Sequence, residues 1–577
     1  MNFESKPNES VETSSAAGRR ARFLRANSDA YGRLVQRIPA SSTTSTDQEL
    51  LGVALAARAA SEFHPGRFAD GLIENRALAI GAGLPEMPLV DANAASQSSR
   101  KGQPSRKGRR RVLHVATQVN SIGGHTRMLF HWAHRDPDSI NSLAVTDQQD
   151  IPVPGWLSQT LSSSGGSCHV APANFGLAEK GIWLRQLARE TADLIVLHHD
   201  PSDVVPTVAF APAGGPPVAR LNIADHQFWL GGTVSDVVIS LRSAGSDHAK
   251  ERRFVTSTAV MPIPLEDPER TVTREEARAS LGIPEDRVAL LSVGRAEKYR
   301  PCSGHDFVGT MSKILDRHPQ AHLFVVGVTP DGIQPHLKGP IHARMHFVGP
   351  VENPTVYRAA ADLYLESFPF GSQTALLEAA LCALPVVPAN APLFPLLVAN
   401  DDALLHLIPN PATEEEYLAR VSSLIENSEL RAQLGRSLRE ALLVDHIGEG
   451  WTNRLRDIYQ RTDQLVHMPH RLPEAECVFA PEDVNLSYWH AAADGKTYSS
   501  FDESDNVSVY AHSAFVAKYL SDYGTARKFA WLALWQNPLR KQSWRLMFVS
   551  VLGRLGEILR ERKLSKRLPL RLSGQSA

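Results

Sequence analysis

The chain has 577 residues, with 61 basic and 62 acidic side chains and a formal net charge of −1. This length allows three or four domains, and the balanced charge excludes a global field that would recruit nucleic acid. No run approaches the ~18 apolar residues that a membrane-spanning helix needs, and the N-terminus has no apolar core of a secretory signal, so we expect a cytoplasmic protein, at most attached to the inner membrane surface.

The N-terminal part divides into two segments. Residues 1–47 are rich in Ser, Thr, Asn and Arg and poor in large apolar residues, which predicts disorder. Residues 48–110 begin with two predicted helices, separated at His64-Pro65-Gly66, and end in a polar, basic stretch over 93–110. Such a stretch is typical of a solvated linker, although it could also contact an anionic membrane or a partner.

Two α/β domains are predicted next, because short buried runs alternate with helical stretches, as in a parallel sheet. The first covers residues 111–265 and the second covers 273–465, with a proline-rich hinge between them at 262–272. Strands are predicted at 112–117, 193–197, 218–221 and 237–240 in the first domain and at 288–293, 322–326, 345–348 and 362–366 in the second.

The C-terminal region, 475–577, has a different composition and reads as helical. Its stretches 508–536 and 540–563 resemble a tetratricopeptide pair (TPR-like), with Asn537-Pro538 in the turn. A single pair cannot bury its own apolar face, so we expect it to pack on the core or to dock a partner. The basic residues from Arg560 onward could touch an anionic membrane or form a solvated helix end.

The stretch 363–387 carries the most information about function. It reads as strand, tight loop, helix, turn and strand, and its loop and helix start offer free N–H groups and a positive dipole end, which suit a phosphate. Glu378 shares a helix face with Thr374, one turn deeper, where it can accept hydrogen bonds from hydroxyls such as those of a ribose. The residues expected around a diphosphate here are Gly371, Ser372, Gln373 and Thr374.

This pattern resembles the nucleotide-sugar half of GT-B glycosyltransferases, whose motif is a glycine loop, a Leu-Leu-Glu-Ala-like helix and Gly-x-Pro-Val-Val. Here Leu376-Leu377-Glu378-Ala379 precedes Ala383-Leu384-Pro385-Val386-Val387. Many retaining members carry a glutamate eight positions before Glu378, where this chain has Phe370. The phrase FPFGSQT is similar to the loop of the protein O-GlcNAc transferase branch. The resemblance therefore favours inversion, and it implies two Rossmann-like domains with helical N- and C-terminal extensions.

The end of the strand at 288–293 also fits the resemblance. Gly294-Arg295…Lys298 resembles the family's diphosphate clamp, and Lys298-Tyr299-Arg300-Pro301 resembles the Lys-Tyr-x-x-Pro form of the same branch. Arg295 and Lys298 would offset the charge of the leaving diphosphate, which gives Lys298 a catalytic role. The alternative is an exposed loop with a surface lysine. In the family, backbone groups near the position of Gly349 receive the base.

Acceptor residues are expected in the first domain, since ligands bind at the carboxyl ends of parallel strands. His125 follows Gly123-Gly124 after the first strand and could take a proton from an acceptor hydroxyl near neutral pH. Asp225 and His226 follow the strand at 218–221 and could orient an acceptor or act as the base. The structural alternatives are a capped glycine turn for His125 and a cap beside an aromatic core for Asp225 and His226.

No metal site is expected. His198 and His199 are adjacent and lack a third ligand at a recognisable spacing, Asp136-Pro137-Asp138 reads as a surface turn, and the four cysteines are widely spaced. A reducing, intracellular setting is the simpler interpretation of such cysteines.

Together these patterns predict a metal-independent hexosyl- or N-acetylhexosaminyltransferase without a resident cofactor. It would use a nucleotide-sugar, with UDP favoured over GDP, and a glycan, lipid-linked or protein acceptor; the oligomeric state stays open. The first alternative is a non-catalytic GT-B scaffold that binds a partner glycosyltransferase or a glycan. A further alternative is a GT-B nucleotide-sugar epimerase, which would act on the donor alone.

Overall fold

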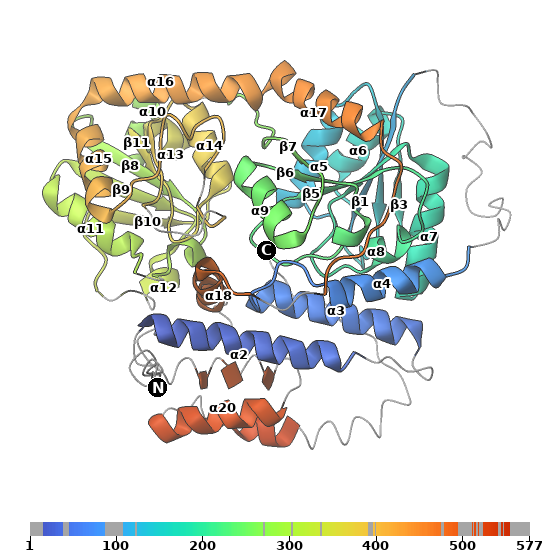
Figure 1. The fold of residues 1–577 in the computed structure, drawn as a ribbon. Helices are drawn as coiled ribbons and strands as arrows, with labels where there is room; N and C mark the ends of the chain where they lie inside the picture. Colours follow the sequence, from blue (N-terminus) through green and yellow to red (C-terminus); the bar gives the residue numbers. More distant parts are fainter. Residues whose placement is uncertain are drawn as a thin grey trace, which may run out of the picture.

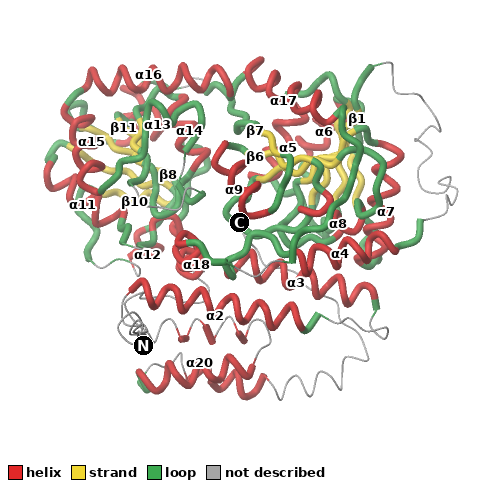
Figure 2. The backbone as a smooth tube through the Cα atoms, in the orientation of Figure 1, coloured by secondary structure: helices red, strands yellow, loops and turns green. Residues whose placement is uncertain are grey.

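A computed structural model gives the fold. It describes residues 16–38, 45–86, 108–121, 124–268, 272–301, 304–334, 337, 339–390, 396–398, 400–474 and 478–493, and parts of 510–553. Two parallel sheets stand side by side, each wrapped in helices (Figures 1 and 2). The predicted α/β class with two Rossmann-like domains and helical extensions is confirmed.

The first sheet has seven parallel strands in the order β3-β2-β1-β4-β5-β6-β7. Its strands are β1 (Arg111–Ala116), β2 (Ile140–Val145), β3 (Cys168–Val170), β4 (Leu194–Leu197), β5 (Val218–Asn222), β6 (Val237–Ser240) and β7 (Thr258–Val260). The flanking helices are α5 (Gly124–His134), α6 (Gly155–Ser163), α7 (Leu177–Thr191), α8 (Val205–Ala209), the 3-10 turn η2 (Gly232–Val234) and α9 (Ser243–Arg253). Four of the seven strands were predicted; β2, β3 and β7 were not.

The second sheet has five parallel strands in the order β10-β9-β8-β11-β12. They are β8 (Val288–Val293), β9 (Ala321–Val326), β10 (Met345–Gly349), β11 (Leu363–Leu365) and β12 (Val386–Val387). Around them lie α10 (Arg274–Leu281), the 3-10 turn η3 (Ala296–Tyr299), α11 (Phe307–Arg317), α12 (Pro330–Ile333), α13 (Thr355–Ala360), α14 (Gln373–Leu381), α15 (Glu414–Glu426) and α16 (Ser428–Asp445).

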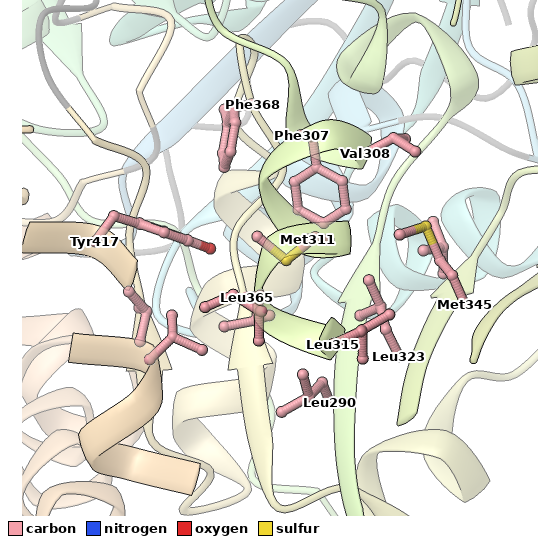
Figure 3. Close-up of a cluster of buried hydrophobic side chains, with 14 of the residues drawn as sticks. Leu290, Phe307, Val308, Met311, Leu315, Leu323, Met345, Leu365, Phe368 and Tyr417 are labelled. Atoms are coloured by element: carbon pink, nitrogen blue, oxygen red, sulfur yellow. The ribbon is translucent and has the colours of Figure 1, made fainter. Parts of the chain in front are cut away.

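The core of the second domain lies between this sheet and its helices. Phe307 and Met311 of α11 pack on Leu290 and Leu365 of the strands (Figure 3). Phe368, in the loop after β11, belongs to the same cluster and is 1% exposed. Burying an aromatic side chain stabilises the fold by about 1.5–3 kcal/mol, so the loop that follows β11 is held by the core itself.

The last helix of the core, α17 (Gly448–Thr462), crosses back to the first domain. It follows α16 along the top of Figure 1 and packs Trp451 and Leu455 into the same cluster as Val112 and Trp132 of the first domain. The hydroxyl of Tyr459 accepts a hydrogen bond from Trp132 at 3.0 Å. Trp451 also donates to the Pro262 carbonyl at 2.9 Å, so α17 ties the chain back to the first domain beside the predicted hinge.

The N-terminal extension and the C-terminal helix α18 (Pro481–Ala493) pack on the core, whereas α20 (Tyr523–Gln536) packs in a separate cluster with other C-terminal residues. The N-terminal helices are α2 (Ala16–Gln36), α3 (Thr46–Phe63) and α4 (Gly71–Gly83). The prediction that residues 1–47 are disordered is wrong for Ala16–Gln36, because this helix buries Phe23 and Tyr31. No helix of the described residues is long and apolar enough to cross a membrane.

Several predicted features fall where little is described. The basic linker before residue 108 and the basic tail after residue 553 lie outside the described residues. Of the two helices predicted in the C-terminal region, α20 covers the end of the first, and the second is described only in parts of 544–553. The likeness to a tetratricopeptide pair stays a prediction.

Candidate active site

Lys298 lies at the carboxyl end of β8, in the turn η3, and reaches the loop that precedes α14. Its Nζ donates to the Gly371 carbonyl at 2.8 Å and lies 5.1 Å from the centre of the Phe370 ring. Burial lowers the pKa of Lys298 to about 8, although the charge of Glu366 opposes the shift. The two sequence motifs that were predicted to bind a diphosphate, at Lys298 and at Gly371, therefore contact each other in the structure.

The start of α14 is already hydrogen-bonded. The N–H of Ser372 donates to Oε1 of Glu366, which also accepts from the Ser367 N–H at 3.0 Å and the Ser367 hydroxyl at 2.9 Å. The expectation that Ser372 offers a free N–H to a phosphate is therefore wrong for this structure. A buried carboxylate takes that position, which is favourable at a helix N-terminus.

Glu366 belongs to this site, although no sequence motif predicted it there. It is fully buried, and its Oε2 has no hydrogen-bond partner among the described residues. Burial raises its pKa to about 7, while the Ser372 N–H and the charge of Lys298 act in the opposite direction. An acidic residue directly after the buried strand β11 was the available signal, because polar side chains at strand ends gather at the ligand edge of a parallel sheet.

The rest of the predicted diphosphate loop contacts a second segment of the domain, at residues 396–398 and 400. The Gly371 N–H donates to the Leu397 carbonyl at 2.6 Å. The Gln373 amide accepts from the Asn400 N–H at 3.0 Å and donates to the Asn400 carbonyl at 2.5 Å. Thr374 is exposed at the start of α14, so of these predicted residues it is the one that faces solvent.

The three remaining residues predicted to bind the nucleotide-sugar are Glu378, Arg295 and Gly349, and the two charged ones already have ion-pair partners. Glu378 forms an ion pair with Arg358, in which its Oε2 accepts a hydrogen bond from Arg358 Nη1 at 2.6 Å, and its side chain is 40% exposed. Arg295 is 61% exposed and pairs with Glu297 at 2.8 Å. Gly349 ends β10 with φ +80°, a left-handed conformation that favours glycine. Glu378 and Arg295 can reach a ligand only by leaving or sharing these partners.

The two sheet domains meet along a seam, where His226 of the first domain faces the loop before α14 of the second. This loop, residues 366–372, is called the donor loop below. Its ring lies 5.0 Å from that of Phe370, in an edge-to-face arrangement. The neighbouring Asp225 is 3.6 Å from His226 Nδ1. His226 of the first domain and Phe370 of the second, which are far apart in the sequence, thus contact each other.

Asp225 is held as a carboxylate. Its Oδ2 accepts from Arg242 Nε at 3.1 Å and Nη2 at 3.0 Å. Burial alone would raise the pKa of Asp225, but the Arg242 charge and the hydrogen bonds from His226 and Arg242 outweigh it and lower the pKa to about 2. Of the two predicted roles, orienting a neighbour or acting as the base, the ion pair with Arg242 favours the first, because a carboxylate that this pairing holds in its charged form is a weak base.

Arg242 also bridges the two domains. It precedes α9 in the first domain and donates to the Leu396 carbonyl at 2.9 Å, the Val398 carbonyl at 2.6 Å and Asn400 Oδ1 at 2.8 Å in the second. A continuous polar path therefore runs from Asp225 through Arg242 and Asn400 to Gln373. The acceptor-side pair and the donor loop are coupled through this path.

His125 lies farther along the same edge of the first sheet. It is exposed in the first turn of α5, after β1, whereas Asp225 and His226 follow β5, with β4 between the two strands. The surrounding protein lowers its pKa by desolvation, which the charge of Asp200 opposes. Gly123 lies outside the described residues. The structure thus brings His226 rather than His125 against the donor loop.

The residues considered as metal ligands have structural partners. Asp136 accepts from the Tyr459 hydroxyl at 2.5 Å, and His198 Nε2 lies 2.9 Å from His114 Nδ1 in the core of the first sheet. His199 Nε2 contacts the Leu230 carbonyl at 3.1 Å. Over the described part of the chain, no group of three or more His, Cys, Asp or Glu side chains could hold a metal.

Part of the second domain matches a known protein family. Residues 287–427, which include β8 to α15, match the model of the family described as Glycosyl transferases group 1. No curated protein matches the chain.

Similar solved structures share little sequence with the chain. A mutant O-GlcNAc transferase of Thermobaculum terrenum is 15% identical, with TM-score 0.46, over 79% of this chain and 85% of that one. The Anabaena protein HepE, in complex with UDP and glucose, is 16% identical, with TM-score 0.46, over 62% and 100%. WaaG, a glycosyltransferase involved in lipopolysaccharide biosynthesis, is 15% identical, with TM-score 0.39, over 60% and 98%.

Such identities say nothing about donor or acceptor. The family match covers the domain that carries Lys298 and the loop before α14, and the sheets have the two-domain order that the sequence predicts. On these two findings, the second of the two Rossmann-like domains contains a group 1 glycosyltransferase domain, over residues 287–427.

Proposed function

We propose that the chain transfers a hexosyl or N-acetylhexosaminyl group from a nucleoside-diphosphate sugar to an acceptor hydroxyl at the seam between its two sheets. The proposal is supported above all by one observation: Lys298 Nζ lies 2.8 Å from the Gly371 carbonyl, on the loop whose Phe370 ring meets His226 of the other domain. The Lys298 ammonium and the His226 imidazole therefore both lie against the Phe370 ring, one from each domain.

The chemistry assigns one role to each side. The acceptor oxygen attacks the anomeric carbon of the sugar while the bond from that carbon to the diphosphate oxygen breaks. His226 takes the hydroxyl proton, with Asp225 holding the imidazole, and Lys298 offsets the charge that develops on the leaving diphosphate. This positive side chain is why we propose transfer without a metal. Phe370 stands where a retaining relative has a carboxylate, so we propose inversion.

The donor and acceptor are proposed more broadly. UDP is the first nucleotide to test, and Glu378 is proposed to meet the ribose after releasing or sharing Arg358. The acceptor is a glycan, a lipid-linked glycan or a protein.

The non-catalytic scaffold remains a second candidate because of specific contacts. Glu366 takes the Ser372 N–H, Gln373 is bonded to Asn400, and Glu378 is paired with Arg358. A chain that no longer binds nucleotides could keep these contacts permanently, whereas a working enzyme has to open some of them.

Thermal unfolding with UDP, GDP, ADP and CMP, each with and without magnesium, separates the two candidates. A ligand that binds the folded state stabilises it by about 2.7 kcal/mol at a hundred times its dissociation constant. We expect UDP to raise the unfolding temperature equally with and without magnesium. No shift with any nucleotide would favour the scaffold, and a shift only with magnesium would contradict metal independence.

We also expect a pH dependence from Lys298. Because burial lowers the pKa of Lys298 to about 8, the free protein holds the ammonium charged below that pH and loses the charge above it. kcat/KM for transfer should therefore fall by about tenfold per pH unit above pH 8, since kcat/KM reports groups of the free enzyme.

The variant Lys298→Arg provides the control for this profile, because arginine keeps its charge. Glu366, whose pKa is about 7, Arg295 and Glu297 also act on the charge of Lys298, and the titration of Glu366 overlaps the start of the alkaline fall. The alkaline fall should disappear in the arginine variant, whatever its absolute rate. An unchanged fall would assign the effect to another group.

A further inference from the structure

Helix α18 lies outside both sheet domains and yet reaches the seam between them (Figure 1). It follows the last core helix and packs on α2 and α3 of the N-terminal extension and on the turn η3 that carries Lys298. Two residues at its end, Trp489 and His490, are 8% and 7% exposed. The proposed reaction gives neither of them a role.

Trp489 contacts the donor side. Its ring stacks on that of Phe370, with centroids 4.3 Å apart and an interplanar angle of 18°. The Lys298 ammonium also lies near the Phe370 ring, 5.1 Å from its centroid. A cation near an aromatic face is attracted by the ring quadrupole, so the orientation of Phe370 affects where the ammonium rests.

The same end of α18 contacts the acceptor side. The His490 ring stacks near that of His226, with centroids 6.3 Å apart at 23°, and the Trp489 ring lies 5.9 Å from His226 in an edge-to-face arrangement. His490 also hydrogen-bonds the backbone of His226. Consecutive residues of one helix therefore touch Phe370 and His226.

The helix is firmly anchored in this position. Asp483, in its first turn, is fully buried and accepts from Arg252 at 2.8 Å and pairs with His64 at 2.9 Å. Ser487 accepts from Asn27 of α2 at 3.2 Å. Leu486 packs in a cluster with Phe23, Phe68, Leu396 and Leu397. These contacts come from the N-terminal extension and from both domains, so the end of α18 is held in one place relative to all three.

Stability alone does not explain the position of these two residues. The indole N–H of Trp489 and Nε2 of His490 are buried and have no hydrogen-bond partner among the described residues. A buried polar group without a partner costs free energy and calls for an explanation. Proteins accept such costs mainly at functional sites.

We infer that α18 is a working part of the transfer site: Trp489 is a positioning residue for Phe370 and Lys298, and His490 is one for His226. The helix thereby sets the distance between the donor-side cation and the acceptor-side imidazole. This inference rests on the proposed function, since the two groups need a fixed distance only if they act on one reacting pair.

The test compares three variants of the full chain. Trp489→Ala removes the stack, Trp489→Phe keeps an aromatic ring, and Trp531→Ala removes a tryptophan of α20 that is 61% exposed. We expect Trp489→Ala to lower kcat for transfer by up to about 100-fold, as a misplacement of about 1 Å can, with KM for the donor changed much less. Trp489→Phe should recover most of the rate, and Trp531→Ala should match the wild type.

Amide hydrogen exchange gives a readout that does not depend on activity. The segment 366–373 should exchange faster in Trp489→Ala than in Trp531→Ala, because the loop loses its stacked partner. Unchanged exchange in this segment overturns the inference, and so does a loosened loop with wild-type kcat or an alanine variant that loses only thermal stability. If the wild type neither binds a nucleoside diphosphate nor transfers a sugar, the proposed function itself fails, which is seen before any variant is made.

Discussion

Replacing Lys298 with alanine is expected to lower kcat for sugar transfer by about 100- to 1,000-fold, the usual loss when one group that stabilises transition-state charge is removed. The physical reason is that the ammonium, fixed against the Gly371 carbonyl at 2.8 Å, would then no longer face the departing diphosphate. The measurement is initial-rate kinetics with the donor identified by thermal unfolding.

The fold should survive this change. Burial disfavours the charged form of Lys298, which its lowered pKa of about 8 reflects, so alanine removes a group that is costly to bury. A suitable control is Lys313→Ala, because Lys313 is 53% exposed and pairs with Glu414 away from the seam. Wild-type transfer by the Lys298 variant, with a native circular dichroism spectrum, would contradict the assignment.

Replacing Arg242 with alanine is expected to destabilise the protein by about 3–5 kcal/mol, the cost of breaking a buried ion pair by removing one partner. The variant leaves Asp225 as a buried, uncompensated carboxylate and removes the hydrogen bonds to Leu396, Val398 and Asn400. The free energy of the first unfolding transition in urea measures this loss.

The matched control for Arg242 is Arg454→Ala. Arg454 is 49% exposed, and its partner Asp445 is 31% exposed, so its ion pair is expected to contribute no more than about 1 kcal/mol. Asp225→Asn should destabilise in the same direction as Arg242→Ala, because it removes the charge that compensates Arg242. A loss below about 1 kcal/mol for Arg242→Ala would show that the two domains are not held together through this residue.

Three strands and one helix of the fold could not be predicted from local sequence pattern. β2 was missed because polar residues interrupt it: Asn141 and Ser142 are buried in the strand, where the amide of Asn141 meets His114 at 3.1 Å. The strands β3 and β7 have three residues each, too few to show periodicity. In α2, a polar composition hid an apolar face at helical spacing that includes Phe23 and Tyr31.

Local sequence by itself determined the two-domain α/β architecture and the positions of Lys298 and the loop before α14. Buried strands and helix starts are encoded by consecutive residues, through side-chain period and free backbone groups. The match of residues 287–427 to a glycosyltransferase family is consistent with those patterns.

Only the tertiary structure decided which of these groups meet. It pairs Asp225 with Arg242, places Glu366 at the start of α14, brings His226 rather than His125 to Phe370, and inserts Trp489 from a helix outside both sheets. The physical reason is that pairing, desolvation and ring stacking depend on distances between residues as much as hundreds of positions apart, and a buried carboxylate or imidazole takes its charge from those neighbours.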